Sequence, residues 1–442
     1  MRVAIHDDLP PEASAMLQAL YSRSAGSVED HVQKVRERGA DRFMASFYVG
    51  YGHASIGDCG YTTLYIEDVS VLACKAVQDN PLFSGQETST RYIDFSKQRV
   101  VDPLGTERSQ RVLARWIDFY TAAEPKVRDH LERTIARPEG QERSAWRKAV
   151  AARTFDILRG FLPAGVTSQT AWTTSLRQAQ EHGLRLSNHP LAEVREIGDS
   201  CLSALRQKYT SSFSHEVSTA EAAYLRLVAE HESYAEPDPS RSDDVELSGG
   251  VSNGVLEEEA LDLIASRPRR SALPKALGRL GRYRCTFRLD FGSFRDLQRH
   301  RGGLCRMPLL TDAYGLHPWY LGELPADLRQ EAEGLLAVQG EEIAQLAAEG
   351  GSRFELQYLQ PMGMLVDTEL HYDLPQMVYV AELRSGETVH PTLRKVAQRM
   401  AAGLSARHPK LALYIDACPD AFSLRRGTQD IVELPVAAPS AA

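Results

Sequence analysis

Two short segments of this chain carry side chains suited to binding an anionic ligand. The first, Ser84-Gly-Gln-Glu-Thr-Ser-Thr-Arg-Tyr92, follows an expected strand. If it is extended, Glu87, Ser89 and Arg91 project to one side and form a row of an acceptor, a hydroxyl and a guanidinium. A guanidinium contacts phosphate in a bidentate manner, so this row suits a nucleotide. A solvated polar loop has the same composition, and spacing alone favours that interpretation.

The second segment runs from Phe294 to Cys305 and contains Arg299-His300-Arg301 before two glycines. These residues place guanidinium groups at an expected helix end, where the glycines let the backbone approach a ligand closely. The alternative is a basic last turn that complements the helix dipole. Cys305 lies nearby, but a nucleophilic thiolate needs a matched partner, so packing is the favoured role for this cysteine.

The elements that must position these segments occur twice in the sequence. The alternating run Thr63–Ser70 matches Thr286–Ser293, and each predicts a strand that runs into a helix capped by the closing serine. About a hundred residues later, Phe161-Leu162-Pro163 and an apolar run resemble Leu359-Gln360-Pro361 and its own run. The chain therefore looks like an internal duplication. Helical periodicity dominates between these marks, at 108–136, 191–211, 325–348 and 391–405.

This pattern predicts an α+β protein made of two fused units, each a small, mainly antiparallel sheet covered by helices. The first unit is expected at residues 1–235 and the second at 255–430, followed by a flexible tail at 431–442. Residues 236–254 are acidic and rich in Pro, Gly and Ser, which predicts a linker. The G-x-S-x-G match at Gly250–Gly254 falls in this linker, so a hydrolase elbow is not expected there.

Composition limits the partners of this 442-residue chain. With 43% hydrophobic residues it can bury sizeable cores, and its formal charge of -8 provides no basic field for nucleic acid or an anionic membrane. The first residues contain no apolar signal region, and no run of eighteen apolar residues occurs, so a cytoplasmic location is expected. The six cysteines lack zinc spacing, and neither a disulfide framework nor a metal site is expected.

The two polar segments resemble two parts of one motif, R-H-R-x-x-S-x-x-x-x-S-x-R-Y, of the flavin-dependent thymidylate synthases (ThyX family). The first half of the chain keeps the second part of the motif, at Ser84, Ser89, Arg91 and Tyr92, but has Asp79-Asn80-Pro81 in place of R-H-R. The second half keeps Arg299-His300-Arg301 but has Leu304, Leu309, Thr311 and Asp312 at the other positions. Three residues fewer separate its strand from R-H-R, which predicts a helix about one turn shorter.

In this family the two parts of the motif face each other across subunits, so the resemblance implies one composite site between the fused units. Further family positions are matched by one copy each. The nucleotide-phosphate arginine is Arg159, where the second copy has Gln357; the flavin-contacting segment is Gly52-His53-Ala54-Ser55, with His53 and Ser55 as ligands. Arg384 matches the nucleotide-contacting arginine and His390 a flavin contact, with Arg185 and His189 as their parallels. Asp373-Leu374-Pro375 replaces an Asn-x-Arg pair that binds flavin phosphate, and Arg177 is the expected substitute.

The resemblance implies an FAD-dependent enzyme that methylates C5 of a uracil nucleotide, using methylene-tetrahydrofolate and NAD(P)H as cosubstrates. Arg384 and Arg299 would stabilise charge on the pyrimidine, with Arg299, His300 and Arg301 also contacting flavin. Asp296 stands where the family usually has Gln, and a carboxylate can accept a hydrogen bond from a ribose 2′-OH. UMP, as in nucleoside-antibiotic C5-methylation, is therefore an alternative to dUMP. A homodimer would form a pseudo-tetramer. The alternative function is a catalytically inactive scaffold that binds flavin or nucleotide.

Overall fold

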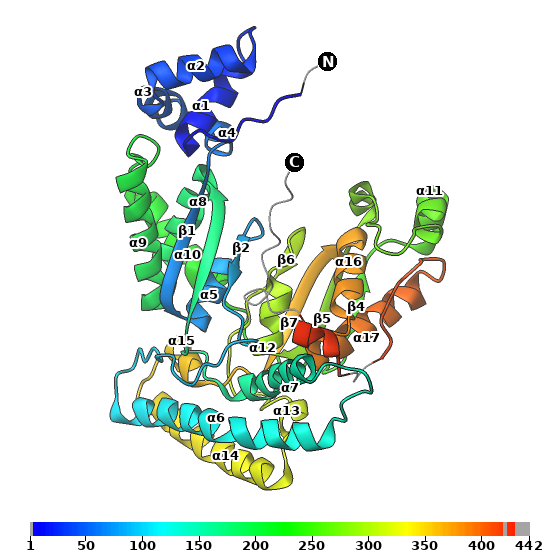
Figure 1. The fold of residues 1–442 in the computed structure, drawn as a ribbon. Helices are drawn as coiled ribbons and strands as arrows, with labels where there is room; N and C mark the ends of the chain where they lie inside the picture. Colours follow the sequence, from blue (N-terminus) through cyan, green and yellow to red (C-terminus); the bar gives the residue numbers. More distant parts are fainter. Residues whose placement is uncertain (1–2, 419–421, 429–442) are drawn as a thin grey trace. The chain divides into compact units, whose positions relative to one another are not determined.

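The computed structural model describes residues 3–418 and 422–428, which form two compact units (Figure 1). Unit 1 contains residues 3–88 and 167–234, and unit 2 contains residues 89–166 and the described part of the chain from 235 onward. Each unit combines helices with one small antiparallel sheet, which confirms the α+β prediction. The predicted tail, residues 431–442, lies outside the described residues.

Unit 1 has a three-stranded antiparallel sheet with β3 in the centre, in the order β1(Tyr61–Ser70), β3(Thr167–Ser175), β2(Ser84–Glu87). Helices α5, α8 and α9 contact this sheet. The helices of unit 1 are α1(Pro11–Tyr21), α2(Val28–Arg38), α3(Asp41–Phe43), the π-helix η1(Met44–Gly50), α4(Ala54–Gly57), α5(Val71–Gln78), α8(Leu176–Ser187), α9(Ala192–Lys208) and α10(Thr219–Glu232).

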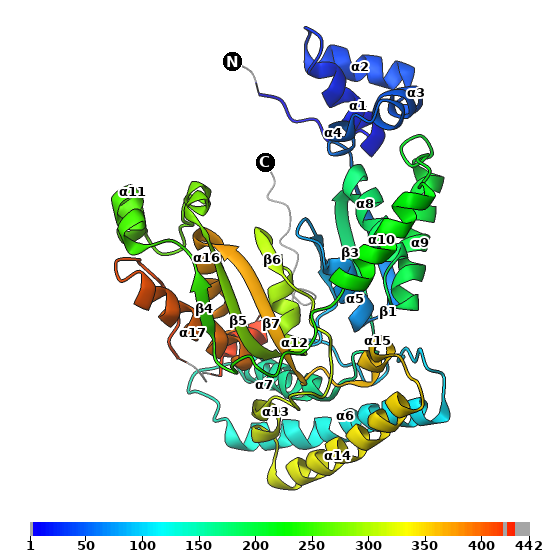
Figure 2. The same cartoon turned by 180° about the vertical axis from the view of Figure 1, so that it is seen from behind.

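Unit 2 has a four-stranded antiparallel sheet in the order β4(Glu246–Gly249), β5(Arg282–Asp290), β7(Leu365–Asp373), β6(Gly303–Cys305) (Figure 2). Helices α16 and α17 contact its strands. The helices of unit 2 are α6(Glu107–Thr134), α7(Arg143–Leu158), η2(Arg159–Phe161), α11(Asn253–Ala265), η3(Lys275–Leu280), α12(Phe291–Gln298), α13(Pro318–Gly322), α14(Ala326–Ala348), α15(Arg353–Leu356), η4(Gln357–Leu359), α16(Leu374–Arg384), α17(Pro391–Arg407) and η5(Leu424–Thr428).

The four helices predicted from periodicity are present as α6, α9, α14 and α17. Two of them, α6 and α14, come from different halves of the chain and lie side by side in unit 2 in both views (Figures 1 and 2). Gln339 Nε2 on α14 donates to the carbonyl of Val112 on α6 at 2.6 Å. Trp116 Nε1 on α6 donates to the carbonyl of Leu359 at 3.0 Å. Helices from the first half of the sequence therefore complete the core of unit 2.

Strand β4 falls inside the segment predicted to be a linker. It pairs with β5, where Leu247 lies opposite Cys285, so the ladder satisfies the backbone of a segment that has little apolar surface of its own. Composition alone does not predict β4, because an edge strand is stabilised mainly by backbone hydrogen bonds to its neighbour and can form with few apolar side chains.

The cap of the second strand–helix unit differs from its prediction. Ser70 caps α5 as predicted, and its Oγ accepts from Ala73 N. In the second copy the cap is Asp290, whose carboxylate accepts from Ser293 N, so Ser293 lies inside α12. The predicted capping role of Ser293 is therefore wrong, because an aspartate three residues earlier serves equally well.

Correcting this cap shifts the repeat by three residues. Helices α5 and α12 then begin at equivalent positions and each has eight residues. The predicted loss of one turn before Arg299 is wrong, and Asp79-Asn80-Pro81 still corresponds to Arg299-His300-Arg301. The remaining difference is a bulge in β1 between Ile66 and Val69, where Asp68 has a φ of 63°.

In the part of the chain that the structure describes, no helix combines the length and the apolar character needed to cross a membrane.

Candidate active site

Arg91, in the loop that follows β2, is anchored inside unit 2. Its Nε and Nη2 donate to the two carboxylate oxygens of Asp156 on α7, at 2.6 and 3.2 Å. Nη2 also donates to the carbonyl of Thr388 at 3.1 Å. Asp156 is 1% exposed and the side chain of Arg91 is 13% exposed. The bidentate pair fixes the direction of a largely buried guanidinium.

The same loop contacts the helix that carries the other half of the motif. Thr90 Oγ1 accepts a hydrogen bond at 3.0 Å from Arg295, which lies on α12 one turn before Arg299. Both residues belong to unit 2 and are buried. The loop with Ser89 and Arg91 is therefore a neighbour of α12, the helix directly before Arg299-His300-Arg301. About two hundred residues separate the two segments in the sequence.

Asp296 on α12 is the centre of a cluster of positive charge. Its Oδ1 accepts from Arg299 Nη2 at 2.7 Å, and the Asp296 side chain is 15% exposed. Burial by itself would raise the pKa of Asp296, but four guanidinium groups outweigh burial and hold this pKa well below its usual range: those of Arg384, Arg299, Arg91 and Arg159. With Asp156 beside Arg91 and Asp290 beside Arg159, three carboxylates face four guanidinium groups, so the cluster keeps an excess of positive charge.

Arg384, the last residue of α16, is oriented by a neutral histidine. Its Nε donates to His300 Nε2 at 2.8 Å, and its Nη2 donates to the carbonyl of Asp296. Burial, followed by the nearby guanidinium of Arg384, lowers the pKa of His300 to about 3. A neutral imidazole has one nitrogen that accepts a hydrogen bond, which is the role that Arg384 requires of Nε2. His300 thus positions Arg384 without adding charge.

Arg159 begins η2 and is 2% exposed. Its Nη2 donates to Ser293 Oγ at 2.7 Å and lies 3.6 Å from Asp290 Oδ2. Asp290 Oδ2 also accepts from the hydroxyl of Tyr320 at 2.7 Å. The cap residue of α12 therefore also holds the arginine that the sequence assigned to phosphate.

His390, the N-cap residue of α17, is fully buried beside Arg159 and Arg91. Its Nδ1 lies 2.8 Å from Thr392 Oγ1 and 3.3 Å from Ser293 Oγ, and its Nε2 lies 3.2 Å from the carbonyl of Asp156. Burial, followed by the charge of Arg159, lowers the pKa of His390 well below its usual value. A neutral His390 can donate from Nε2 to that carbonyl, and it links α12, α17 and α7.

Several guanidinium nitrogens in this region lack partners. The Nε atoms of Arg159, Arg299 and Arg426 are buried and make no hydrogen bond with the described residues. A buried unsatisfied donor typically costs about 1–3 kcal/mol. An anionic ligand would satisfy such donors, so the site suits a group rich in oxygen acceptors, such as a phosphate.

Glu87, in contrast, belongs to unit 1, and its side chain is 3% exposed. Its Oε2 lies 2.7 Å from Lys75 Nζ and accepts from Gln78 Nε2 at 2.9 Å. Lys75 and Gln78 on α5 occupy the positions that Arg295 and Gln298 occupy on α12, once both helices are counted from their caps. Glu87 is thus engaged in a buried ion pair at the end of α5.

The two residues predicted to contact flavin before the first strand also lie in unit 1. His53 precedes α4 next to the rings of Phe47 and Tyr51, and its Nδ1 is buried without a hydrogen-bond partner among the described residues. Ser55 is exposed on α4. An orphaned imidazole nitrogen beside an exposed tyrosine ring is compatible with a planar polar ligand.

Other side chains singled out in the sequence have plain roles in the structure. Ser89 Oγ accepts from the backbone N of Arg91 at 3.3 Å, and Arg301 is exposed beyond α12. Cys305 is buried on β6, which agrees with a packing role. A strand and a helix do flank Gly250–Gly254, contrary to expectation, but Ser252 is exposed and its hydroxyl caps α11.

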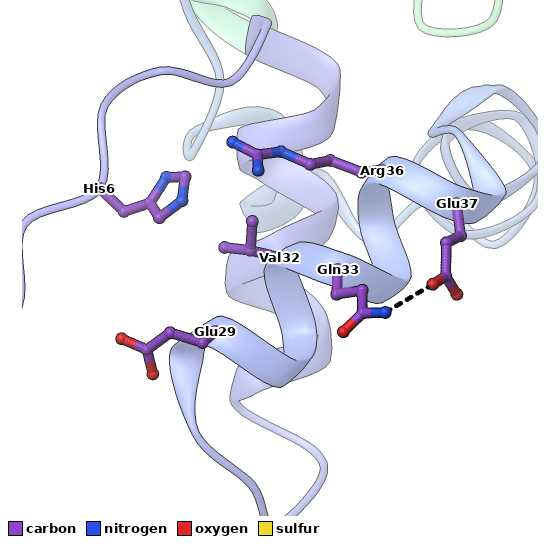
Figure 3. Close-up of a pocket in the computed structure, with 6 residues that line it drawn as sticks. All are labelled: His6, Glu29, Val32, Gln33, Arg36 and Glu37. Atoms are coloured by element: carbon purple, nitrogen blue, oxygen red, sulfur yellow. Dashed lines mark hydrogen bonds between the residues drawn. The ribbon is translucent and has the colours of Figure 1, made fainter.

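A hollow of about 540 Å³ lies away from these residues, among the first helices of unit 1 (Figure 3). Figure 3 shows Gln33 bonded to Glu37, and Arg36 pairs with Asp8 at 2.6 Å. None of the predicted site residues lines this hollow. In the described residues, no group of three or more His, Cys, Asp and Glu is placed to hold a metal ion.

Sequence reasoning missed three residues that organise the cluster: Asp156, Asp290 and Arg426. Asp156 lies three residues before Arg159 on the same helical face, and this spacing was a usable signal. Asp290 was visible as an N-cap candidate. Arg426 lies near the end of the sequence outside any motif, so nothing in the sequence pointed to it.

A family model matches the first half of the chain, and three relatives match most of its length. Residues 6–209 match the family model described as "Thymidylate synthase complementing protein". The chain is similar to a UPF0159 protein of Chlamydia pneumoniae, with 27% identity over 87% of this chain and 81% of that protein. A UPF0159 protein of Chlamydia muridarum is 26% identical over 81% of this chain and 77% of its own length. A third UPF0159 protein, from Thermoplasma acidophilum, is 23% identical over 89% of this chain and 93% of its own length. These similarities extend well beyond residues 6–209.

Proposed function

We propose that this chain is a member of the flavin-dependent thymidylate synthases and methylates C5 of a uracil nucleotide, because residues 6–209 match the family model described as "Thymidylate synthase complementing protein". The substrate is dUMP or UMP, and the product carries a methyl group in place of the C5 hydrogen, which leaves as a proton. Methylene-tetrahydrofolate supplies the carbon. FAD, when bound, supplies reducing equivalents that NAD(P)H replenishes.

The observation that carries the proposal is the cluster of four guanidinium groups around Asp296. The phosphate of a nucleoside monophosphate carries a charge of about -1.5 to -2 at neutral pH. Buried cations with unsatisfied Nε atoms are therefore stabilised when such a group binds. This excess of positive charge is local, because the whole chain carries a formal charge of -8.

Each residue of the cluster has a distinct role in the proposed site. Arg91 and Arg159 bind the phosphate, and Arg299 and Arg384 face the uracil carbonyls, where they stabilise negative charge as C5 becomes nucleophilic. Asp296 fixes Arg299, and neutral His300 fixes Arg384. These donors are already oriented, so little reorganisation is needed at the moment of reaction.

The residues present fit parts of FAD unequally. In unit 1, the buried and unpartnered Nδ1 of His53 would bond a polar atom of the flavin; in unit 2, the cationic end of α12 would donate to an oxygen acceptor. The segment Asp373-Leu374-Pro375 does not fit its diphosphate, because Asp373 caps α16 and Pro375 has no N–H to donate. Arg177, the expected substitute, lies 2.7 Å from Asp58 and would have to exchange that carboxylate for a phosphate.

Tritium release tests the proposal. The purified protein is incubated with FAD, methylene-tetrahydrofolate, NADPH and either UMP or dUMP labelled with tritium at C5. Release from one nucleotide identifies the substrate. Failure with both would refute the enzyme, and nucleotide binding without release would leave the inactive scaffold as the function.

A pair of variants ties the activity to one copy of the repeat. Arg384→Gln is expected to abolish tritium release, because its guanidinium belongs to the proposed site. Arg185→Gln is the matched control, since Arg185 donates to Asp79 at the end of α5 in unit 1, much as Arg384 donates to the end of α12. Equal loss in both variants would contradict the assignment of the site to Arg384.

A further inference from the structure

Arg426 on η5 contacts the loop that carries Arg91 at two points and also contacts Asp156 on α7, although no motif marks it. Its Nη1 donates to Asp156 Oδ2, and its Nη2 donates to the backbone carbonyl of Arg91 at 3.3 Å. Its guanidinium carbon lies 5.1 Å from the centre of the Tyr92 ring, which is within the range of a cation–π interaction. The side chain is 7% exposed. One arginine thus contacts the backbone, a ring and the carboxylate that together define this loop.

The segment that carries Arg426 is closely seated on α7. A Cβ added to Gly427 would lie 1.9 Å from the carbonyl oxygen of Ala145, so only glycine permits this approach. The preceding residue, Arg425, points outward with a side chain that is 79% exposed, and it pairs with Glu387 at 2.9 Å. Two adjacent arginines therefore occupy opposite environments, and only Arg426 is directed to Asp156.

The charge balance explains what Arg426 adds. Asp156 and Arg91 alone form a neutral pair, and a neutral pair attracts a phosphate weakly. Because Arg426 shares the same carboxylate, the group of three keeps one positive charge. The adjoining cavity, lined in part by Arg153, Asp156 and Arg426, has a volume of about 20 Å³, which is enough for a water molecule but not for a nucleotide. Arg426 therefore acts through its neighbours.

We infer that Arg426 is a positioning residue, which holds the loop at residues 89–92 in place and, by sharing Asp156, keeps the guanidinium of Arg91 available to the phosphate of a nucleoside monophosphate. The inference rests on the proposed function for the identity of the ligand. It adds a residue outside the family motif, brought to the site by the C-terminal part of unit 2.

Calorimetric titration with UMP, dUMP and uridine tests this inference. Arg426→Gln should weaken binding of the nucleotide at least tenfold, or about 1.4 kcal/mol, while uridine affinity changes less than twofold. Arg425→Gln is the matched control, because it removes the same charge from the same segment, and it should bind as the wild type does. Arg426→Lys keeps the charge but cannot span Asp156 and the Arg91 carbonyl together, so it should lose several-fold. A merely structural role would weaken nucleotide and nucleoside alike.

Hydrogen exchange of the ligand-free protein provides a second readout. Peptides that cover residues 89–95 should exchange faster in Arg426→Gln than in Arg425→Gln, because the loop has lost its anchor. Unchanged nucleotide affinity and unchanged exchange in Arg426→Gln would overturn the inference alone. If that variant does not fold, wild-type nucleotide affinity in Arg426→Lys would overturn it. A wild-type protein that binds neither UMP nor dUMP would overturn the proposed function, and this inference with it.

Discussion

Replacing Asp296 with asparagine should change stability and anion binding in opposite directions. The substitution keeps the shape of the side chain but removes the carboxylate around which four guanidiniums gather. Breaking a buried ion pair by removing one partner costs about 3–5 kcal/mol. Here the side chains of Asp296 and Arg299 are 15% and 32% exposed, so solvent screening reduces the expected loss of unfolding free energy to about 2 kcal/mol. The unfolding midpoint should fall by roughly 4 °C, at about 2 °C per kcal/mol for a unit of this size.

The same change should tighten phosphate binding. One negative charge fewer in a partly screened site favours a dianion by roughly 1 kcal/mol, or about fivefold in affinity. Inorganic phosphate is the cleanest probe, because it has no ribose. If Asp296 also accepts a hydrogen bond from a ribose 2′-OH, the gain should be larger for dUMP than for UMP.

The assay combines thermal unfolding, with and without phosphate, and calorimetric titration of the wild type and Asp296→Asn. Glu259→Gln is a suitable control, since Glu259 pairs with Arg279 at an exposed position of unit 2. If Asp296→Asn is as stable as the wild type, or binds phosphate more weakly, then the Asp296 carboxylate does not partly neutralise the guanidinium groups around it, and the reasoning is refuted.

Three further predictions concern unit 1. Burial lowers the pKa of His182 to about 4. In the unfolded chain this histidine binds a proton below pH ~6.5, whereas in the folded chain it stays neutral down to about pH 4. Stability should therefore fall by roughly 2 kcal/mol at pH 5, and His182→Gln, measured by urea unfolding at pH 7 and 5, should lose much of that dependence. Lys75→Met should destabilise the protein by about 3–5 kcal/mol, because it leaves the buried Glu87 carboxylate without its cation. Adding Glu87→Gln should recover much of this loss. A double variant that is no more stable than Lys75→Met would contradict a structural ion pair. Gly85→Ala should weaken the pairing of β2 with β3, because the new Cβ would lie 1.9 Å from the carbonyl oxygen of Ala171; unchanged thermal stability and unchanged exchange of the β2 amides would show that the strand relaxes freely.

Much of the local structure could be predicted from the sequence, because period and caps are local signals. The strand ending at Ser70 and the four periodic helices follow from alternation and helical spacing. The second strand was placed three residues out of register because Asp290 and Ser293 are both good caps, and composition does not say which one is used. The bulge at Asp68 also disturbs the alternation against which the two strands were compared.

Tertiary placement was harder to predict. An amphipathic helix shows that one face is buried, but not what buries it, so the packing of α6 and α7 into unit 2 could not be read from their sequences. The complementary halves of the motif predict that Arg91 and Arg299 contact one ligand. That stays a prediction, although both guanidinium groups lie near Asp296. Glu87 differs from these two arginines. The sequence placed it in the same row as Ser89 and Arg91, but in the structure it pairs with Lys75 in unit 1. The predicted domain boundaries at 235 and 255 describe the two copies of the sequence repeat, and they stay a prediction. The two compact units are defined by contacts instead, and unit 2 also includes residues 89–166.

The order in which unit 2 is assembled has a consequence for synthesis on the ribosome. Residues 89–166 emerge early, but the helices and strands that bury their apolar side chains, such as Trp116 and Phe161, follow only after residue 235. Unit 1, in contrast, is complete once residue 234 has emerged. For the time needed to translate the second half, at about 5–20 residues per second, the long amphipathic helix α6 exposes its apolar face without a partner. Nascent chains halted near residue 235 should therefore bind chaperones through α6 and α7, and a gene cut between the two repeats should yield a first half that aggregates.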